Sequence, residues 1–275
     1  MEEREDSQAA VAPEIVTRHR LSTRIWHWLN ALTVFVMLMS GLMIFNAHPR
    51  LYWGDYGANA DHAWLEIGST REAGYLRIGS LTVPTTGLLG HRTDWSGTVR
   101  RYAFPGWATI PSAYNLAAAR RWHLAFAWVL AIGLIAYLTI ILINRHWRGL
   151  LPHRTELKPR HLWREVADHA RLRFAKGAAA LHYNTLQKLS YAGIVFLVLP
   201  VVILTGLTMS PGMNAAWPWL LDLFGGRQSA RSIHFICAFL LVGFILVHLI
   251  MVALTGPLKQ IGAMITGRQQ LEQPE

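Results

Sequence analysis

Four long apolar stretches constrain the fold of this chain more than any other feature of its sequence. They cover residues 25–45, 122–144, 189–209 and 233–254, and their central parts contain no Asp, Glu, Lys or Arg. Each has about twenty residues, the length that a helix needs to cross the hydrocarbon core of a bilayer. Backbone N–H and C=O groups in lipid must bond within their own segment, so such segments span as helices. The sequence therefore predicts an all-α integral membrane protein, built as an antiparallel bundle of four transmembrane helices.

The connections between these stretches carry most of the basic residues of a chain whose net charge is +10. The connection 145–188 has ten Lys and Arg against three acidic residues, and the connection 46–121 has eight against five. Lys and Arg accumulate on the cytoplasmic side of membrane proteins. We therefore expect a multi-pass membrane protein with cytoplasmic tails 1–24 and 259–275, a cytoplasmic connection 145–188 and an extracytoplasmic loop 46–121. Charge distributed in this way indicates membrane lipid as a partner and does not indicate nucleic acid.

A single cysteine, Cys237, limits the cofactor chemistry. One thiol excludes an internal disulfide, a cysteine-ligated iron–sulfur cluster and a C-x-x-C-H site for covalent haem. We expect Cys237 to be a small buried hydrophobic residue.

Four histidines are the only strongly ionisable residues of the spans: His27, His123, His234 and His248. Residues fourteen apart on one helix, as His234 and His248 are, point to within about 40° of each other and lie about 21 Å apart along the axis. An ionisable side chain inside a span predicts a functional site. The alternative is that each imidazole bonds only to backbone or lipid. Outside the spans, solvated or capping roles are expected for the other nine histidines, at positions 19, 48, 62, 91, 146, 153, 161, 169 and 182.

In an antiparallel bundle the four histidines form two pairs at two depths. His27 begins the first span and His248 lies near the end of the fourth, on the cytoplasmic side, whereas His123 and His234 begin the second and fourth spans on the outer side. Each pair would fill both axial positions of a haem iron, which suits electron transfer because no open site remains. Zinc or copper is the alternative, but two histidines without a carboxylate or thiolate make a poor site for either metal. The sequence therefore predicts two b haems, one held by His27 and His248 and one by His123 and His234.

Arginines lie beside these proposed ligands, Arg24 at the inner pair and Arg120 and Arg121 at the outer pair. Haem propionates are carboxylates, and a guanidinium matches carboxylate geometry. The alternative is that the three side chains only extend to the membrane surface at helix ends. Five glycines within the spans either give a flat ring room to approach or serve helix packing: Gly41, Gly133, Gly193, Gly206 and Gly243.

The two long connections are expected to fold over the ends of the bundle. The loop 46–121 is rich in Gly, Pro, Trp and Tyr, which predicts a cap of short turns over the outer face rather than a linker. Its aromatic and Arg residues favour docking of a partner, and a lid that only shields the bundle is the alternative. Apolar residues recur at helical spacing through 159–174 with Arg between them. This pattern predicts an amphipathic helix, lying on the inner leaflet or packed on the end of the bundle.

The motifs around the histidines resemble one family. R-x-x-H-W opens the first span, a histidine opens the second, Y-N-x-x-Q-K at 183–188 leads into the third, and the fourth contains H-x13-H. Together they resemble the bacterial dihaem cytochrome b family, whose members are membrane subunits of nickel–iron hydrogenase, formate dehydrogenase and thiosulfate reductase complexes. The resemblance covers residues 18–45, 120–145 and 182–258, and it indicates one cytochrome b domain over 25–258.

The resemblance implies electron transfer between an extracytoplasmic redox subunit, of the hydrogenase or molybdenum oxidoreductase type, and the membrane quinone pool. In this family the quinone binds beside the cytoplasmic haem, near the start of the third span. Asn184 is then the candidate partner for a quinone carbonyl, with Gln187 beside it, and an N-cap is the alternative role for Asn184. The long loop 46–121 departs from the smaller family members and favours a docking platform.

Two other classes of function stay open from the sequence. A stand-alone cytochrome that oxidises quinol and passes electrons to a small diffusing oxidant such as superoxide would need no partner, and the long loop 46–121 weighs against it. A transporter or a structural anchor would hold no haem. The absorbance of the purified protein separates this last class from the others.

Overall fold

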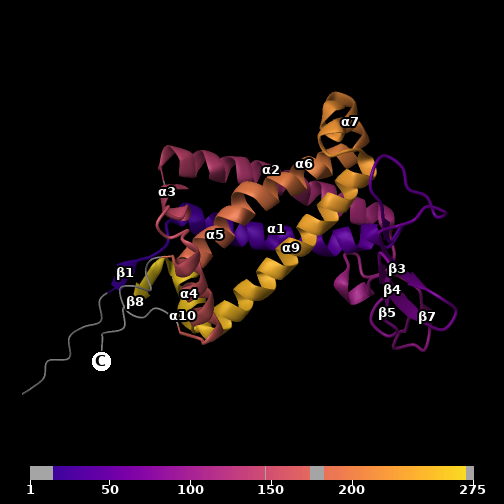
Figure 1. Cartoon of the computed structure of the whole chain (residues 1–275), viewed down its shortest axis with the longest axis horizontal. Helices are drawn as coiled ribbons and strands as arrows, with labels where there is room; N and C mark the ends of the chain where they lie inside the picture. Colours follow the sequence, from indigo (N-terminus) through magenta and orange to yellow (C-terminus); the bar gives the residue numbers. More distant parts are fainter. Residues whose placement is uncertain (1–14, 146, 174–182, 271–275) are drawn as a thin grey trace, which may run out of the picture.

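The computed structural model describes residues 15–145, 147–173 and 183–270 of the chain, so His146, Phe174 and His182 lie outside the described residues. Within these ranges four helices are long and apolar enough to cross a membrane: Leu21–Phe45, Leu116–Ile143, Thr185–Met209 and Arg227–Leu254. They form the body of the molecule (Figure 1). The predicted helical membrane bundle is thereby confirmed.

Each spanning helix begins before its apolar core. The first helix is α1 (Leu21–Phe45), the second α2 (Leu116–Ile143) and the fourth α9 (Arg227–Leu254). The helix α2 begins at Leu116 because Asn115 caps it, its side-chain oxygen accepting a hydrogen bond from the N–H of Ala118 at 2.9 Å. A polar first turn of this kind extends the helix beyond the apolar segment, and hydropathy alone does not reveal it.

The third span consists of three consecutive segments, α5 (Thr185–Gly193), the π-helical turn η3 (Ile194–Val198) and α6 (Leu199–Met209). Pro200 stands at the start of α6 and has no N–H to bond to the carbonyl one turn earlier. A π turn next to such a position is a common way to absorb the missing bond.

The core lies midway along the bundle. The helix α1 packs along α2, and α6 packs along α9. Their buried side chains form one apolar cluster of eight residues, which includes Cys237 as expected: Val34, Leu130, Leu134, Val198, Leu199, Val202, Cys237 and Leu241.

The loop 46–121 folds as β-structure, so the predicted cap of short turns is wrong. Four strands make an antiparallel sheet in the order β2 (Arg50–Leu51), β3 (Leu65–Ser69), β4 (Gly74–Ile78) and β5 (Leu81–Pro84). A hairpin of β6 (Arg92–Thr93) with β7 (Val99–Arg100) and the 3-10 turn η1 (Gly106–Ala108) follow. The end of the bundle that carries β2–β7 is called the sheet end below (Figure 1).

The sheet folds here because its side chains find partners far away in the sequence. Leu65 and Ile67 of β3 are buried with Phe45 and Phe104 in a second apolar cluster. Between them Glu66 points to the other side of the strand, where Arg50 (2.7 Å) and Arg77 pair with its carboxylate and Tyr75 donates a hydrogen bond to it at 3.0 Å. A buried carboxylate is tolerated only when it is paired in this way.

The loop is also fixed to the first turns of α9. The carbonyl of Gly54 accepts from the N–H groups of Gln228 (2.9 Å) and Ser229 (3.1 Å), two donors that a helix start leaves without partners. The indole N–H of Trp64 donates to Ser232 at 3.0 Å, and Ser232 in turn donates to the carbonyl of Tyr52 at 2.6 Å. These bonds explain why α9 begins at Arg227 rather than at residue 233. Two short helices, α7 (Pro211–Ala216) and α8 (Trp219–Leu223), connect α6 to α9 at this end.

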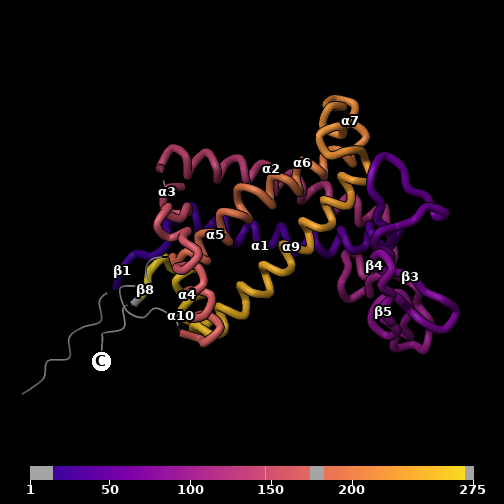
Figure 2. Tube along the Cα trace, in the orientation of Figure 1, coloured from indigo at the N-terminus to yellow at the C-terminus, as the bar shows by residue number. Residues whose placement is uncertain are grey.

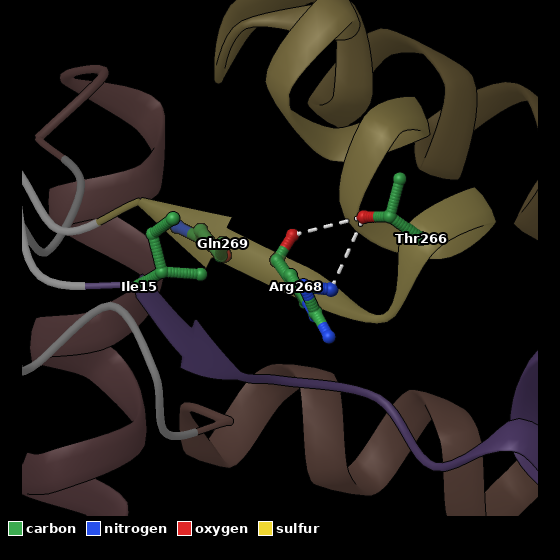
Figure 3. A pocket seen from close by; sticks show the side chains of 4 residues that line it. All are labelled: Ile15, Thr266, Arg268 and Gln269. Carbon is green, nitrogen blue, oxygen red and sulfur yellow. Dashed lines mark hydrogen bonds between the residues drawn. The ribbon is translucent and has the colours of Figure 1, made fainter.

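The opposite end of the bundle holds both ends of the described chain and is called the terminal end below (Figure 2). Strand β1 (Ile15–Thr17) pairs antiparallel with β8 (Arg268–Gln270). Figure 3 shows this pairing, with the hydroxyl of Thr266 bonded to the backbone of Arg268. Three further helices lie at this end: α3 (Trp147–Leu150), α4 (Pro159–Ala170) and α10 (Pro257–Thr266).

The amphipathic helix α4 presents polar side chains to the bundle. Its Glu165 accepts hydrogen bonds from the backbone N–H groups of Thr185 (3.3 Å) and Leu186 (3.1 Å) at the start of α5. Trp163 and Val166 on other faces of α4 are exposed. The helix is therefore packed on the end of the bundle, and its contact with the inner leaflet stays a prediction.

Candidate functional site

The structure brings the four span histidines together in the two expected pairs. His27 of α1 and His248 of α9 lie at the terminal end with their ring centres 6.2 Å apart and their planes at 58°. His123 of α2 and His234 of α9 lie at the sheet end, also with ring centres 6.2 Å apart and with planes at 60°. The two pairs have nearly the same geometry although α9 pairs with α1 in one and with α2 in the other.

This spacing fits one metal ion between the two rings of each pair. Imidazole nitrogens bind metal ions at about 2 Å, so two rings that share one ion have centres on the order of 6 Å apart. Ring contacts elsewhere among the described residues range from 4.5 to 6.4 Å, so it is the match between the two pairs that indicates a shared type of site, since rings bonded to backbone alone would have no reason to match. Two neutral imidazoles are also a donor set that would hold a b haem.

At the sheet end a backbone carbonyl and a hydroxyl fix the ring of His123. Its Nδ1 lies 3.1 Å from the carbonyl oxygen of Met37 and 3.1 Å from Oγ of Ser40. A carbonyl can only accept, so Nδ1 carries the proton and Nε2 keeps a free lone pair. This is the tautomer in which Nε2 can bind a metal.

The ring of His234 is held in the same way by α6. Its Nδ1 lies 2.9 Å from the carbonyl oxygen of Val202 and 3.1 Å from Oγ1 of Thr205. In both cases a glycine follows the hydroxyl residue, and a Cβ added at Gly41 or Gly206 would lie 3.4 Å from Cε1 of the neighbouring histidine. The sequence analysis named these glycines but missed the two hydroxyls. The sequence signal for these hydroxyls is a Ser-Gly pair in the first span and a Thr-Gly pair in the third.

At the terminal end the histidines are held by rings instead. Nδ1 of His27 is buried and has no hydrogen-bond partner among the described residues, and its ring meets Trp28 edge-on at 5.0 Å. Phe244 stacks on His248 with ring centres 5.9 Å apart. Tyr191 contacts Phe244, and Tyr183 contacts Tyr191, so aromatic rings connect this pair to the start of the third span.

The three predicted propionate arginines occupy different surroundings. Arg24 is half-buried, and its Nε has no hydrogen-bond partner in the part of the chain that the structure describes. Arg120 and Arg121 are exposed, and neither makes an ion pair with another residue of the described ranges. The charges at both ends are therefore available for a carboxylate, and their assignment to propionates stays a prediction.

Asn184 and Gln187 form a capping box at the start of α5. Oδ1 of Asn184 accepts from the N–H of Gln187 at 2.8 Å, and Oε1 of Gln187 accepts from the N–H of Asn184 at 3.2 Å. The amide nitrogen of Asn184 also lies 3.2 Å from Nε2 of His169. Asn184 thus has the capping role that the sequence analysis gave as the alternative, and one N–H of its amide remains for a further acceptor.

Charged groups at the terminal end stabilise this arrangement. The hydrogen bond from Lys188 is the largest effect that lowers the pKa of Glu156. Burial acts to raise the pKa of Glu165, but its hydrogen bonds with Leu186 and Thr185 outweigh burial and lower it. Burial also raises the pKa of the Tyr183 hydroxyl. Both carboxylates are therefore ionised at neutral pH, whereas the Tyr183 hydroxyl keeps its proton.

The fold and the paired histidines define a membrane cytochrome of the b type. The family model described as prokaryotic cytochrome b561 matches residues 18–267, and the chain belongs to this family. Membership implies a b-type haem and electron transport in a membrane. The predicted class of protein is confirmed.

One similar protein carries a more specific name. The putative protein-methionine-sulfoxide reductase subunit YedZ1 of Azospira oryzae is 27% identical over 258 residues. The match covers 94% of this chain and all of the relative.

Proposed function

We propose that this chain is the dihaem, quinone-reactive subunit of a respiratory-type oxidoreductase. One b haem is bound by His27 and His248, and a second by His123 and His234. The observation that carries the proposal is the equal 6.2 Å separation of the two histidine pairs at opposite ends of the bundle. When bound, the haems supply one-electron chemistry. The protein fixes their positions and excludes other ligands from the iron.

Side chains of this protein orient the haem ligands, supply positive charge and exclude water at the two sites. Hydrogen bonds on Nδ1 hold His123 and His234 in the tautomer that presents Nε2 to a metal. Arg24 at the terminal end, and Arg120 and Arg121 at the sheet end, supply positive charge for propionates. The apolar cluster between the pairs, which includes Leu130 and Leu241, keeps water out of the space between them.

The orientation of the bundle in the membrane is part of the same proposal. The sheet end faces the extracytoplasmic side of a bacterial inner membrane, and the terminal end, with both tails, faces the cytoplasm. The partner is an extracytoplasmic redox subunit that docks on the loop 46–121. The name of the relative favours a methionine-sulfoxide reductase type of partner over a hydrogenase type. With a reductase as partner, electrons run from quinol at the terminal end to the sheet end.

The quinone binds at the terminal end beside the start of α5. The rings of Tyr183 and Tyr191, which meet edge to face, supply an aromatic lining close to the His27–His248 pair. Asn184 supplies the donor to a quinone carbonyl through the amide N–H that its contact with His169 leaves free, and Gln187 holds Asn184 in place. The superoxide alternative would use the same quinol site, and it differs in needing no docked partner.

Stopped-flow reduction by a short-chain quinol tests this function in the purified protein. We expect haem absorbance to report reduction, and Asn184→Asp to slow it. Losing one hydrogen bond costs about 1 kcal/mol, which corresponds to roughly fivefold. An aspartate keeps the cap but loses the N–H donor, whereas Asn184→Leu loses both.

The two variants separate the roles of Asn184. Thermal stability should fall in Asn184→Leu and stay near the wild-type value in Asn184→Asp. A wild-type reduction rate in Asn184→Asp would show that Asn184 only caps the helix. Failure of any quinol to reduce either haem would contradict the quinone-reactive function itself.

A further inference from the structure

The ring of His123 and the ring of His234 are oriented by the same local motif. In α1 the carbonyl of Met37, the hydroxyl of Ser40 and Gly41 face His123, and in α6 the carbonyl of Val202, the hydroxyl of Thr205 and Gly206 face His234. The carbonyl, hydroxyl and glycine have the same relative positions, i, i+3 and i+4, in both helices. Two helices that differ in sequence thus present one arrangement to two rings.

Each hydroxyl is a second acceptor for the single Nδ1–H that the carbonyl also accepts, because the proton of the hydroxyl is directed elsewhere. Ser40 donates to the carbonyl of Met37 at 3.2 Å, and Thr205 donates to the carbonyl of Val201 at 2.7 Å. Each hydroxyl oxygen is left with lone pairs toward Nδ1 of its histidine. Both side chains are fully buried, so water cannot replace them. No such acceptor is within reach of Nδ1 of His27 among the described residues.

We propose that Ser40 and Thr205 are positioning residues that set the reduction potential and the ligand-plane geometry of the sheet-end haem. The proposal rests on the proposed function, in which His123 and His234 bind that haem. An acceptor on Nδ1–H raises the basicity of the imidazole, which favours the ferric state. Among the described residues, Nδ1 of His27 at the terminal end has no such acceptor, so the hydroxyls make the surroundings of the two pairs unequal.

Redox titration of the purified full-length protein tests the inference. The variants Ser40→Ala and Thr205→Val should keep two haems per chain and shift the potential of the sheet-end component to more positive values. The double variant should shift it further. Thr205→Ser keeps the acceptor and should restore the wild-type potential. The electron paramagnetic resonance signal of the ferric haem depends on the angle between the imidazole planes, and it should change with the potential.

Thr208→Val is the matched control, because Thr208 is also buried in α6 but, among the described residues, its hydroxyl bonds to the carbonyl of Thr205 and to no histidine. It should leave both the potential and the resonance signal unchanged. An unshifted potential in Ser40→Ala and Thr205→Val, or an equal shift in Thr208→Val, would overturn the inference while leaving the two-haem function intact. A wild-type protein with fewer than two haems would instead overturn the proposed function and this inference with it.

Discussion

At the residue scale, the two histidine pairs have equal spacing but unequal support. His123 and His234 each bond through Nδ1 to a carbonyl and a hydroxyl, whereas His27 and His248 are held by Trp28 and Phe244. Rings packed by other rings can tilt more readily than rings held by hydrogen bonds. The sheet-end pair is therefore the more rigid of the two.

Removing one histidine of α9 should remove one haem. His234→Ala is expected to lose the sheet-end haem and His248→Ala the terminal-end haem, because each leaves its iron with a single ligand in an enlarged pocket. Optical difference spectra should then show the loss of a different component in each variant. His62→Ala, an exposed position in the loop 46–121, is the control and should keep both components. Loss of the same component in both α9 variants would argue against separate sites.

At the element scale, the β6–β7 hairpin is the part of the loop most suited to docking. Asp94 holds its tip by accepting from the N–H groups of Ser96 (3.0 Å) and Thr98 (2.9 Å) and by pairing with Arg100 (2.9 Å). Trp95 at this tip is 99% exposed. Arg92 and Arg100 lie directly opposite each other across the hairpin. Like charges in such positions repel, and an acidic partner surface would relieve the repulsion.

Trp95→Ala should weaken copurification of the redox partner without loss of haem. An exposed Trp at the centre of an interface contributes on the order of 2 kcal/mol, which is roughly thirtyfold in affinity. The fold should be unaffected because Trp95 has no packing to lose. Trp163→Ala, an exposed Trp of α4 at the opposite end, is the control. Full copurification of the Trp95→Ala protein would place docking on another part of the loop.

The contact between α4 and α5 depends on the ionised carboxylate of Glu165. Its folded-state pKa is lowered, so its stabilisation is complete above the ordinary glutamate pKa and is lost as the pH falls through the lowered value. Glu165→Gln should lose about 2 kcal/mol of this local stability at neutral pH. Hydrogen exchange of α4 and of the first turn of α5 should then become faster.

Asp168→Asn on the same helix is the control, because Asp168 makes no ion pair within the described part of the chain. Unchanged exchange in Glu165→Gln would show that apolar contacts alone hold α4 in place. If α4 of the wild-type protein were as well protected from exchange below the ordinary glutamate pKa as it is at neutral pH, the same conclusion would follow.

At the scale of the whole molecule, the sequence predicts what depends on local composition. The four spans and the pairing of the histidines follow from hydropathy and helical periodicity, and the structure places His27 near His248 and His123 near His234. The sheet of the loop depends on contacts between distant residues, such as Glu66 with Arg50 and Trp64 with Ser232. No local pattern encodes them. Ser40 and Thr205 were missed because a hydroxyl in a span usually bonds only to its own helix.

The haem content of the purified protein tests the central claim most directly. A pyridine haemochrome assay, normalised to protein by amino-acid analysis, should give two haems b per chain. This result is expected because two pairs of imidazoles stand at opposite ends of one bundle with the same 6.2 Å separation. A stoichiometry of one haem per chain, or none, in protein that retains its helical fold would contradict the account.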